Sequence, residues 1–118
     1  MRPIFDQSGT AVAFKQGDEL FALDGTYLAA FDGEWMVNRQ GKAVAHFETG
    51  WIRDLRGDCI AFMEGASGGP MTPHTRMAPI PPTPGITPMA SIASLSPLPP
   101  ILSVNWNSTG WGGLKQLM

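Results

Sequence analysis

The sequence predicts an all-β fold in which four 16-residue β-hairpin repeats surround a pseudo-four-fold axis, followed by an extended proline-rich C-terminal tail. Three observations support this prediction. Glycine and alanine each recur every sixteen residues, short apolar segments alternate with the glycines, and ten of the eleven prolines lie between Pro70 and Pro100. Regular glycine bends are typical of short paired strands, whereas dense proline is incompatible with helix or sheet.

The repeat is defined by residue types at fixed positions. The glycines are Gly9, Gly25, Gly41 and Gly57. The alanines are Ala13, Ala29, Ala45 and Ala61. An apolar residue opens each unit, at Ile4, Leu20, Met36 and Ile52. So many matches at one spacing indicate an internal repeat.

Each repeated glycine follows a polar residue between two strand-like segments, where it can supply the positive φ of a hairpin tip. A second glycine follows eight or nine residues later, at Gly17, Gly33, Gly50 and Gly65. The spacing leaves strands of about five residues, so we expect eight antiparallel strands. Simple alternation places Val12 and Phe14 on a bulky face and Ala13 on an opposite, small face, and likewise in the other units. Cys59 then shares the small face with Ala61 and packs there as a small hydrophobe.

The invariant alanine has two interpretations: a crowded axis where backbones approach one another, or an ordinary layer of small packed residues. The fourth unit ends in a Gly/Ser/Pro segment, residues 65–70, without the apolar pair that opens each next unit. We expect Ile4 and Phe5 to supply that pair and close the ring. A propeller blade needs about forty residues, so a pinwheel of hairpins or a small closed barrel remains.

On this x-Gly-x-x-[Val/Leu/Ile]-Ala pattern, residues 4–68 resemble the four-fold beta flower domain family. The resemblance implies a bacterial domain with four hairpins around a pseudo-four-fold axis. No function is assigned to that family, and no catalytic residue carries over to this chain.

The predicted domain organisation has three parts: a repeat domain at 1–69, a proline-rich extended segment at 70–102, and a Trp/Gly-containing segment at 103–118. Leaving Trp106 and Trp111 in water would forfeit about 1.5 to 3 kcal/mol each. We therefore expect both to dock on the hairpins or on a neighbouring subunit. With Trp35 and Trp51 they are candidate interaction residues.

Charge excludes some partners. All ten acidic residues lie before residue 65, and they outnumber the basic ones there, with Arg53 and its neighbours offset by carboxylates. Such a surface does not favour nucleic acid. Prolines interrupt the uncharged stretch from residue 77 to 114, which argues against a membrane span. A lone Cys59 and no secretory leader favour the reducing cytoplasm.

No cluster of residues specifies a reaction, metal or cofactor. His46 is a potential ligand or base, but a core position is the simpler interpretation, and no metal-ligand spacing involves His74. Aspartates such as Asp24 and Asp54 fit turn hydrogen bonding better than paired-acid catalysis. We therefore predict a non-enzymatic structural or protein-interaction module that self-associates. The alternative is a small-ligand domain that binds a sugar or peptide through aromatic residues near the hairpin tips.

Overall fold

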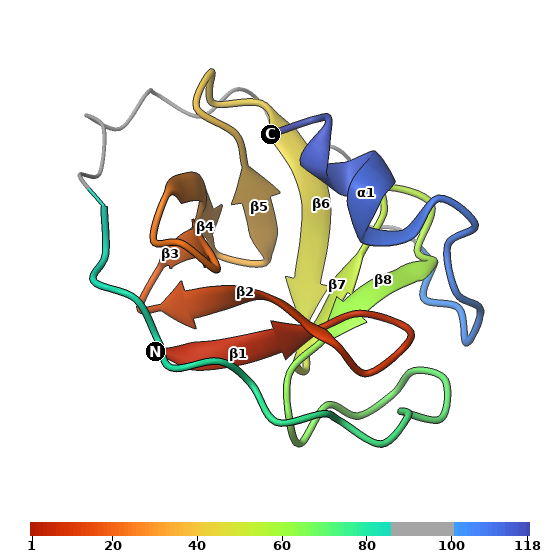
Figure 1. Cartoon of the computed structure of the whole chain (residues 1–118). Helices are drawn as coiled ribbons and strands as arrows, with labels where there is room; N and C mark the ends of the chain where they lie inside the picture. Colours follow the sequence, from red (N-terminus) through yellow and green to blue (C-terminus); the bar gives the residue numbers. More distant parts are fainter. Residues whose placement is uncertain (86–100) are drawn as a thin grey trace.

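The computed structural model describes residues 1–85 and 101–118, and its repeat region is a closed antiparallel barrel (Figure 1). The predicted all-β class is confirmed. The strands are β1 (Arg2–Phe5), β2 (Ala11–Gln16), β3 (Glu19–Ala22), β4 (Tyr27–Asp32), β5 (Trp35–Val37), β6 (Ala43–Glu48), β7 (Trp51–Arg53) and β8 (Cys59–Phe62). Each strand pairs with its neighbours in sequence, and β1 pairs with β8.

Ring closure depends on the first strand. Phe5 in β1 pairs with Phe62 in β8, so the N-terminal segment supplies the strand that the fourth unit lacks. This is the closure expected from the missing apolar pair. A closed barrel has no free sheet edge, which removes a surface prone to non-specific strand pairing.

The repeated glycines lie in the hairpin loops at one end of the barrel, which we call the tip end. Gly9, for example, has φ of +81° and donates its N–H to Asp6 O. Asp6 Oδ1 accepts the N–H groups of Ser8 and Thr10, and Asn38 and Asp54 act in the same way in units three and four. An Asp or Asn three residues before the glycine therefore shapes three of the four loops.

The barrel interior is filled by pairs of one large and one small residue. The pairs are Ile4 with Ala13, Leu20 with Ala29, Met36 with Ala45, and Ile52 with Ala61. All eight side chains are fully buried. An eight-stranded barrel is just wide enough for side chains to fill. The alanine layer therefore faces the axis and leaves room for the larger partner across the sheet.

The expectation that valine and alanine rows point to opposite faces is wrong. The register shifts by one residue in every unit, for example between Ile4 and Phe5, which pair with Ala13 and Ala11. Val12 is the extra residue of this β-bulge, and a bulge breaks the simple alternation. The whole bulged row therefore packs with the interior alanines. The row is Val12, Leu28, Val44 and Ile60.

The same bulge corrects the expected position of Cys59. It lies on the outer surface of the barrel with Phe5, Trp51 and Phe62, whereas Ala61 faces the interior. Cys59 is nevertheless fully buried, because the C-terminal tail covers it.

One short helix, α1 (Gly110–Lys115), closes the tip end of the barrel (Figure 1). Leu114 is buried in the interior cluster, and Trp111 and Met118 pack against it beside the bulged row. Within residues 1–85 and 101–118, no helix has the length and apolar character needed to cross a membrane.

Enlarging the alanine layer should overpack the axis. We predict that Ala45→Leu lowers the free energy of unfolding by about 1 to 3 kcal/mol, measured by urea denaturation. Ala30→Leu is the matched control, because Ala30 lies on the outer surface where units one and four have Phe14 and Phe62. A control as destabilised as the Ala45 variant would contradict an interior that is filled to its limit.

Candidate functional sites

The described part of the tail runs across the hairpin tips of the barrel. We call residues 70–85 and 101–107 the strap. Gly9 O accepts a hydrogen bond from Arg76 N–H at 2.9 Å, and Gly25 O accepts one from Gly85 N–H at 2.7 Å. In the fourth unit, Ser103 N–H reaches Gly57 O at 3.3 Å. The predicted extended segment, residues 70–102, is thus held at two tips, and Ser103 of the following segment is held at a third. Residues 86–100 lie outside the described part of the chain.

The strap gives the tip glycines a second role. A Cβ on Gly9 would overlap the carbonyl oxygen of His74, and one on Gly25 would overlap that of Thr83. Glycine therefore serves here both for positive φ and for close approach of another backbone. Only the first of these reasons is visible in the sequence.

Arg53 is a buried cation that links Gly68, just before the strap, to Ser103 within it. Its guanidinium donates to Gly57 O and Ser103 O at 2.7 and 2.6 Å, and to Gly68 O at 2.9 Å. The side chain is 1% exposed. These hydrogen-bond partners are backbone carbonyls, and the expectation that neighbouring carboxylates offset its charge stays a prediction. The equivalent residues of the other units are Phe5, Phe21 and Val37.

The four tryptophans have different environments. Trp51 is buried, and its ring lies 5.6 Å from that of Phe62 and 5.4 Å from that of Trp106. Cys59 and Trp106 form a short parallel bridge. In it, Cys59 N–H donates to Asn105 O and Asn107 N–H donates to Cys59 O, each at 2.8 Å. Trp111 packs at the tip end. Trp35 lies on the side of the barrel, with its ring edge-on to that of His46.

The strap exposes several large apolar side chains. Met71, Met77 and Ile80 are each more than nine-tenths exposed, and Ile101 is 89% exposed. The backbone near Met77, Ile80 and Ile101 is nevertheless held by the tip hydrogen bonds of Arg76, Gly85 and Ser103. Large apolar side chains on an anchored segment are a feature of association surfaces.

The other end of the barrel, which we call the mouth, contains a cavity of about 480 Å³. Arg2, Lys15, Phe47 and Met63 are among its lining residues. Lys15 Nζ lies 5.0 Å from the ring centre of Phe31 and 5.5 Å from that of Phe47, and it donates to Gly17 O at 2.6 Å. The mouth therefore combines one aromatic ring, that of Phe47, with the cationic residues Arg2 and Lys15 and the acidic residue Glu64.

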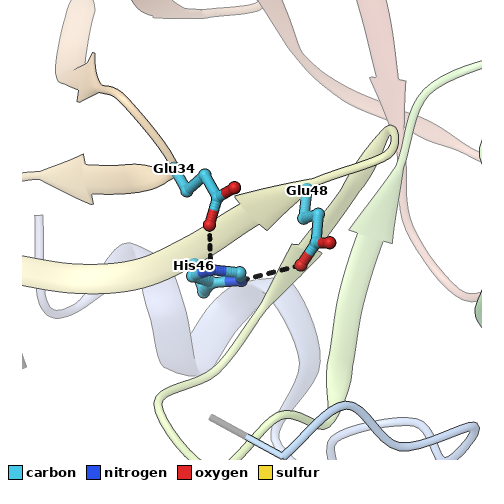
Figure 2. A group of neighbouring side chains, drawn as sticks. All are labelled: Glu34, His46 and Glu48. Atoms are coloured by element: carbon cyan, nitrogen blue, oxygen red, sulfur yellow. Dashed lines mark hydrogen bonds and ion pairs between the residues drawn. The ribbon is translucent and has the colours of Figure 1, made fainter. Parts of the chain in front are cut away.

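A second polar group lies on the outer surface near the mouth. Glu34 in the β4–β5 turn and Glu48 at the end of β6 flank His46 (Figure 2). His46 Nε2 is 3.2 Å from Glu34 Oε2, and Nδ1 is 4.0 Å from Glu48 Oε2. The imidazole is 1% exposed, whereas the Glu34 and Glu48 side chains are 64% and 35% exposed. Sequence analysis identified His46 but neither carboxylate.

A signal for these carboxylates was present in the sequence. His46 and Glu48 are two residues apart on one strand and share a face. Trp35 pairs with His46, which brings the preceding turn residue, Glu34, to the same place. That inference required the register, which the repeat spacing alone does not provide.

The remaining candidates have structural explanations. Burial raises the pKa of the Cys59 thiol, so the thiolate needed for nucleophilic attack is disfavoured. Asp24 accepts the Thr26 N–H at 2.9 Å, and that hydrogen bond lowers its pKa. Asp54 accepts two N–H groups of its own loop. These contacts fit the turn interpretation of the aspartates.

Comparison with known proteins adds one family. A family model described as a 4-fold beta flower protein matches residues 2–114. No curated protein and no solved structure matches the chain. The matched region includes the strap and most of α1 as well as the barrel.

Replacing Arg53 should release the strap. We predict that Arg53→Met costs at least about 3 kcal/mol of unfolding free energy, because three backbone carbonyls, that of the buried Gly57 among them, lose a charged donor. Amide exchange at Cys59 and Asn107, whose N–H groups bond across the strap, should accelerate. Arg56→Met, at an exposed loop position, is the control and should change stability by less than about 0.5 kcal/mol. Unchanged exchange in the Arg53 variant would contradict this role.

Proposed function

The chain belongs to the 4-fold beta flower family, and from this premise we propose that it is a non-enzymatic protein-interaction module that self-associates through the strap. The observation that carries the proposal is the row of large apolar side chains held outward by an anchored backbone. The proposed setting is the reducing cytoplasm, without nucleic acid or membrane as a partner. The raised pKa of the buried Cys59 thiol supports a non-catalytic role.

Anchoring favours association energetically. A free tail would lose conformational entropy on binding, at about 0.5 to 1.5 kcal/mol for each immobilised side chain plus the ordering of the backbone. The strap backbone is already fixed at Gly9, Gly25 and Gly57. Most of the ordering cost is therefore met within the monomer, and burial of Met77 and Ile80 remains as a gain.

The strap also favours a second copy as the partner. The chain has no charged residue between Arg76 and Lys115. Arg76 is the one charged residue of the strap, so two copies that meet on this surface bring fewer like charges together than contact elsewhere on an acidic protein would.

We predict a concentration-dependent oligomer in sedimentation velocity experiments at micromolar concentration. Met77→Ser combined with Ile80→Ser should shift the protein to monomer, because the two most exposed apolar groups of residues 76–85 lose their burial. Leu23→Ser combined with Leu55→Ser is the control, since both leucines are partly exposed but lie outside the strap. A wild-type protein that sediments only as monomer would exclude self-association.

The mouth cavity favours a second candidate function, the binding of a small organic anion. Its volume of about 480 Å³ is within the range of small-molecule sites. The Lys15 ammonium has three donors, and Gly17 O occupies one of them. The Phe47 ring, which lines the same cavity beside Lys15, is placed to contact an apolar part of the ligand. The expected ligand class is a small carboxylate or a sugar acid.

Saturation-transfer NMR with a panel of carboxylates and sugar acids tests this function. We expect Lys15→Met to weaken binding at least about tenfold, the effect of one lost charged hydrogen bond. Methionine is the matched choice because Met63 occupies the equivalent position in unit four. Equal saturation transfer in wild type and variant, or none with any ligand, would count against the mouth as a binding site.

A further inference from the structure

We propose that Glu34, His46 and Glu48 bind a divalent transition-metal ion on the outer surface of the barrel, beside the mouth (Figure 2). One ligand atom from each residue can be chosen so that all three lie within 4.8 Å of one another. This proposal does not depend on self-association or on ligand binding in the mouth cavity.

A neutral His46 imidazole cannot donate a hydrogen bond to both of the carboxylates that flank it. A neutral imidazole has one N–H donor and one lone pair. If Nε2 donates to Glu34 at 3.2 Å, the lone pair of Nδ1 faces Glu48 Oε2 at 4.0 Å. Nδ1 is buried and has no hydrogen-bond partner. The opposite tautomer transfers the conflict to Glu34. A cation beside the imidazole removes the conflict, and that cation is either a second proton or a metal ion.

The net charge of the three residues also favours a divalent cation. Two carboxylates and a neutral imidazole carry two negative charges, which a divalent ion neutralises. Arg53 is the cross-strand neighbour of His46, but its guanidinium is directed to the carbonyls of Gly57, Gly68 and Ser103. The carboxylates therefore have no bound guanidinium from that neighbour to neutralise them.

The imidazole is held rigidly, whereas the two carboxylates are accessible to an ion from solvent. Burial and the edge-on ring of Trp35, at 4.9 Å between centroids, hold the imidazole in place. The two carboxylates are partly exposed at the ends of flexible side chains. They can therefore contract around an ion to bond lengths of about 2.0 to 2.2 Å. Mixed nitrogen and oxygen ligands favour Zn²⁺, Co²⁺ or Mn²⁺, whereas Ca²⁺ and Mg²⁺ prefer oxygen alone.

The repeat supplies matched controls for this site. Glu64 stands in unit four where Glu48 stands in unit three, but Phe62 replaces the histidine there. Phenylalanine also occupies this position in unit one, as Phe14. His46→Phe therefore removes the nitrogen ligand while it introduces a residue that the fold already accepts at equivalent sites.

The experiment is equilibrium dialysis of the full, chelator-treated chain against Zn²⁺, Co²⁺, Mn²⁺ and Ca²⁺, with elemental analysis of the bound metal. We expect one transition-metal ion per chain and no comparable binding of Ca²⁺. His46→Phe should reduce binding to background, and Glu34→Gln and Glu48→Gln should each weaken it at least about tenfold. Glu64→Gln and His74→Gln should bind as the wild type does. Circular dichroism establishes that each variant is folded.

A second readout reports the position of the ion. Co²⁺ bound at His46 should quench the fluorescence of the neighbouring Trp35, and His46→Phe should abolish the saturable part of that quenching. Wild-type binding no tighter than that of folded His46→Phe would overturn the proposal. Loss of binding in His74→Gln would overturn it in favour of a different site.

Discussion

The narrow interior of the barrel is the constraint on which the rest of the structure depends. Four large side chains reach the axis, and each faces an alanine on the adjacent strand, as Met36 faces Ala45. A second large residue at those positions would have no space, and a second small one would leave a void. The unit length of sixteen residues therefore reflects one repeated packing solution, with two strands and two turns per large-small pair. Stability of a core this small also needs further apolar burial.

The β-bulge provides part of that burial, and it explains where sequence reasoning succeeded and failed. The tip glycines, the strand number and the closure by Ile4 and Phe5 follow from periodicity, which the sequence displays directly. The bulge at Val12 leaves no mark in a hydrophobic pattern, because valine suits either face of a strand. It turns Val12 inward beside Ala13, and the equivalent bulge at Ile60 in unit four places Cys59 and Ala61 on opposite faces. Face assignments based on strict alternation therefore fail at this position in each unit.

The strap and helix α1 cover what the barrel leaves open at the tip end. Trp111 and Leu114 close the axis above the bulged row, while Trp106 covers Trp51 on the outer wall. Composition indicated an extended tail that docks, but it did not show where the tail binds. Residues in contact, such as Arg76 and Gly9, are far apart in sequence, and their contacts are made by backbone atoms. Backbone hydrogen bonds leave no pattern of side chains. For the same reason the close approach at the tip glycines was invisible before the fold was known.

Departures from the repeat are where individual residues acquire specific roles. Arg53 replaces an apolar residue and binds three carbonyls of the loop and tail. Lys15 replaces a residue that is Phe or Met elsewhere, and it gives the mouth a cation. His46 replaces Phe or Ala and lies between two carboxylates. Burying a charged or polar group is costly unless it has partners, so each exception to an apolar consensus requires a compensating contact. In a repeat protein the other units show what the fold alone demands, and the residue that differs shows what has been added to it.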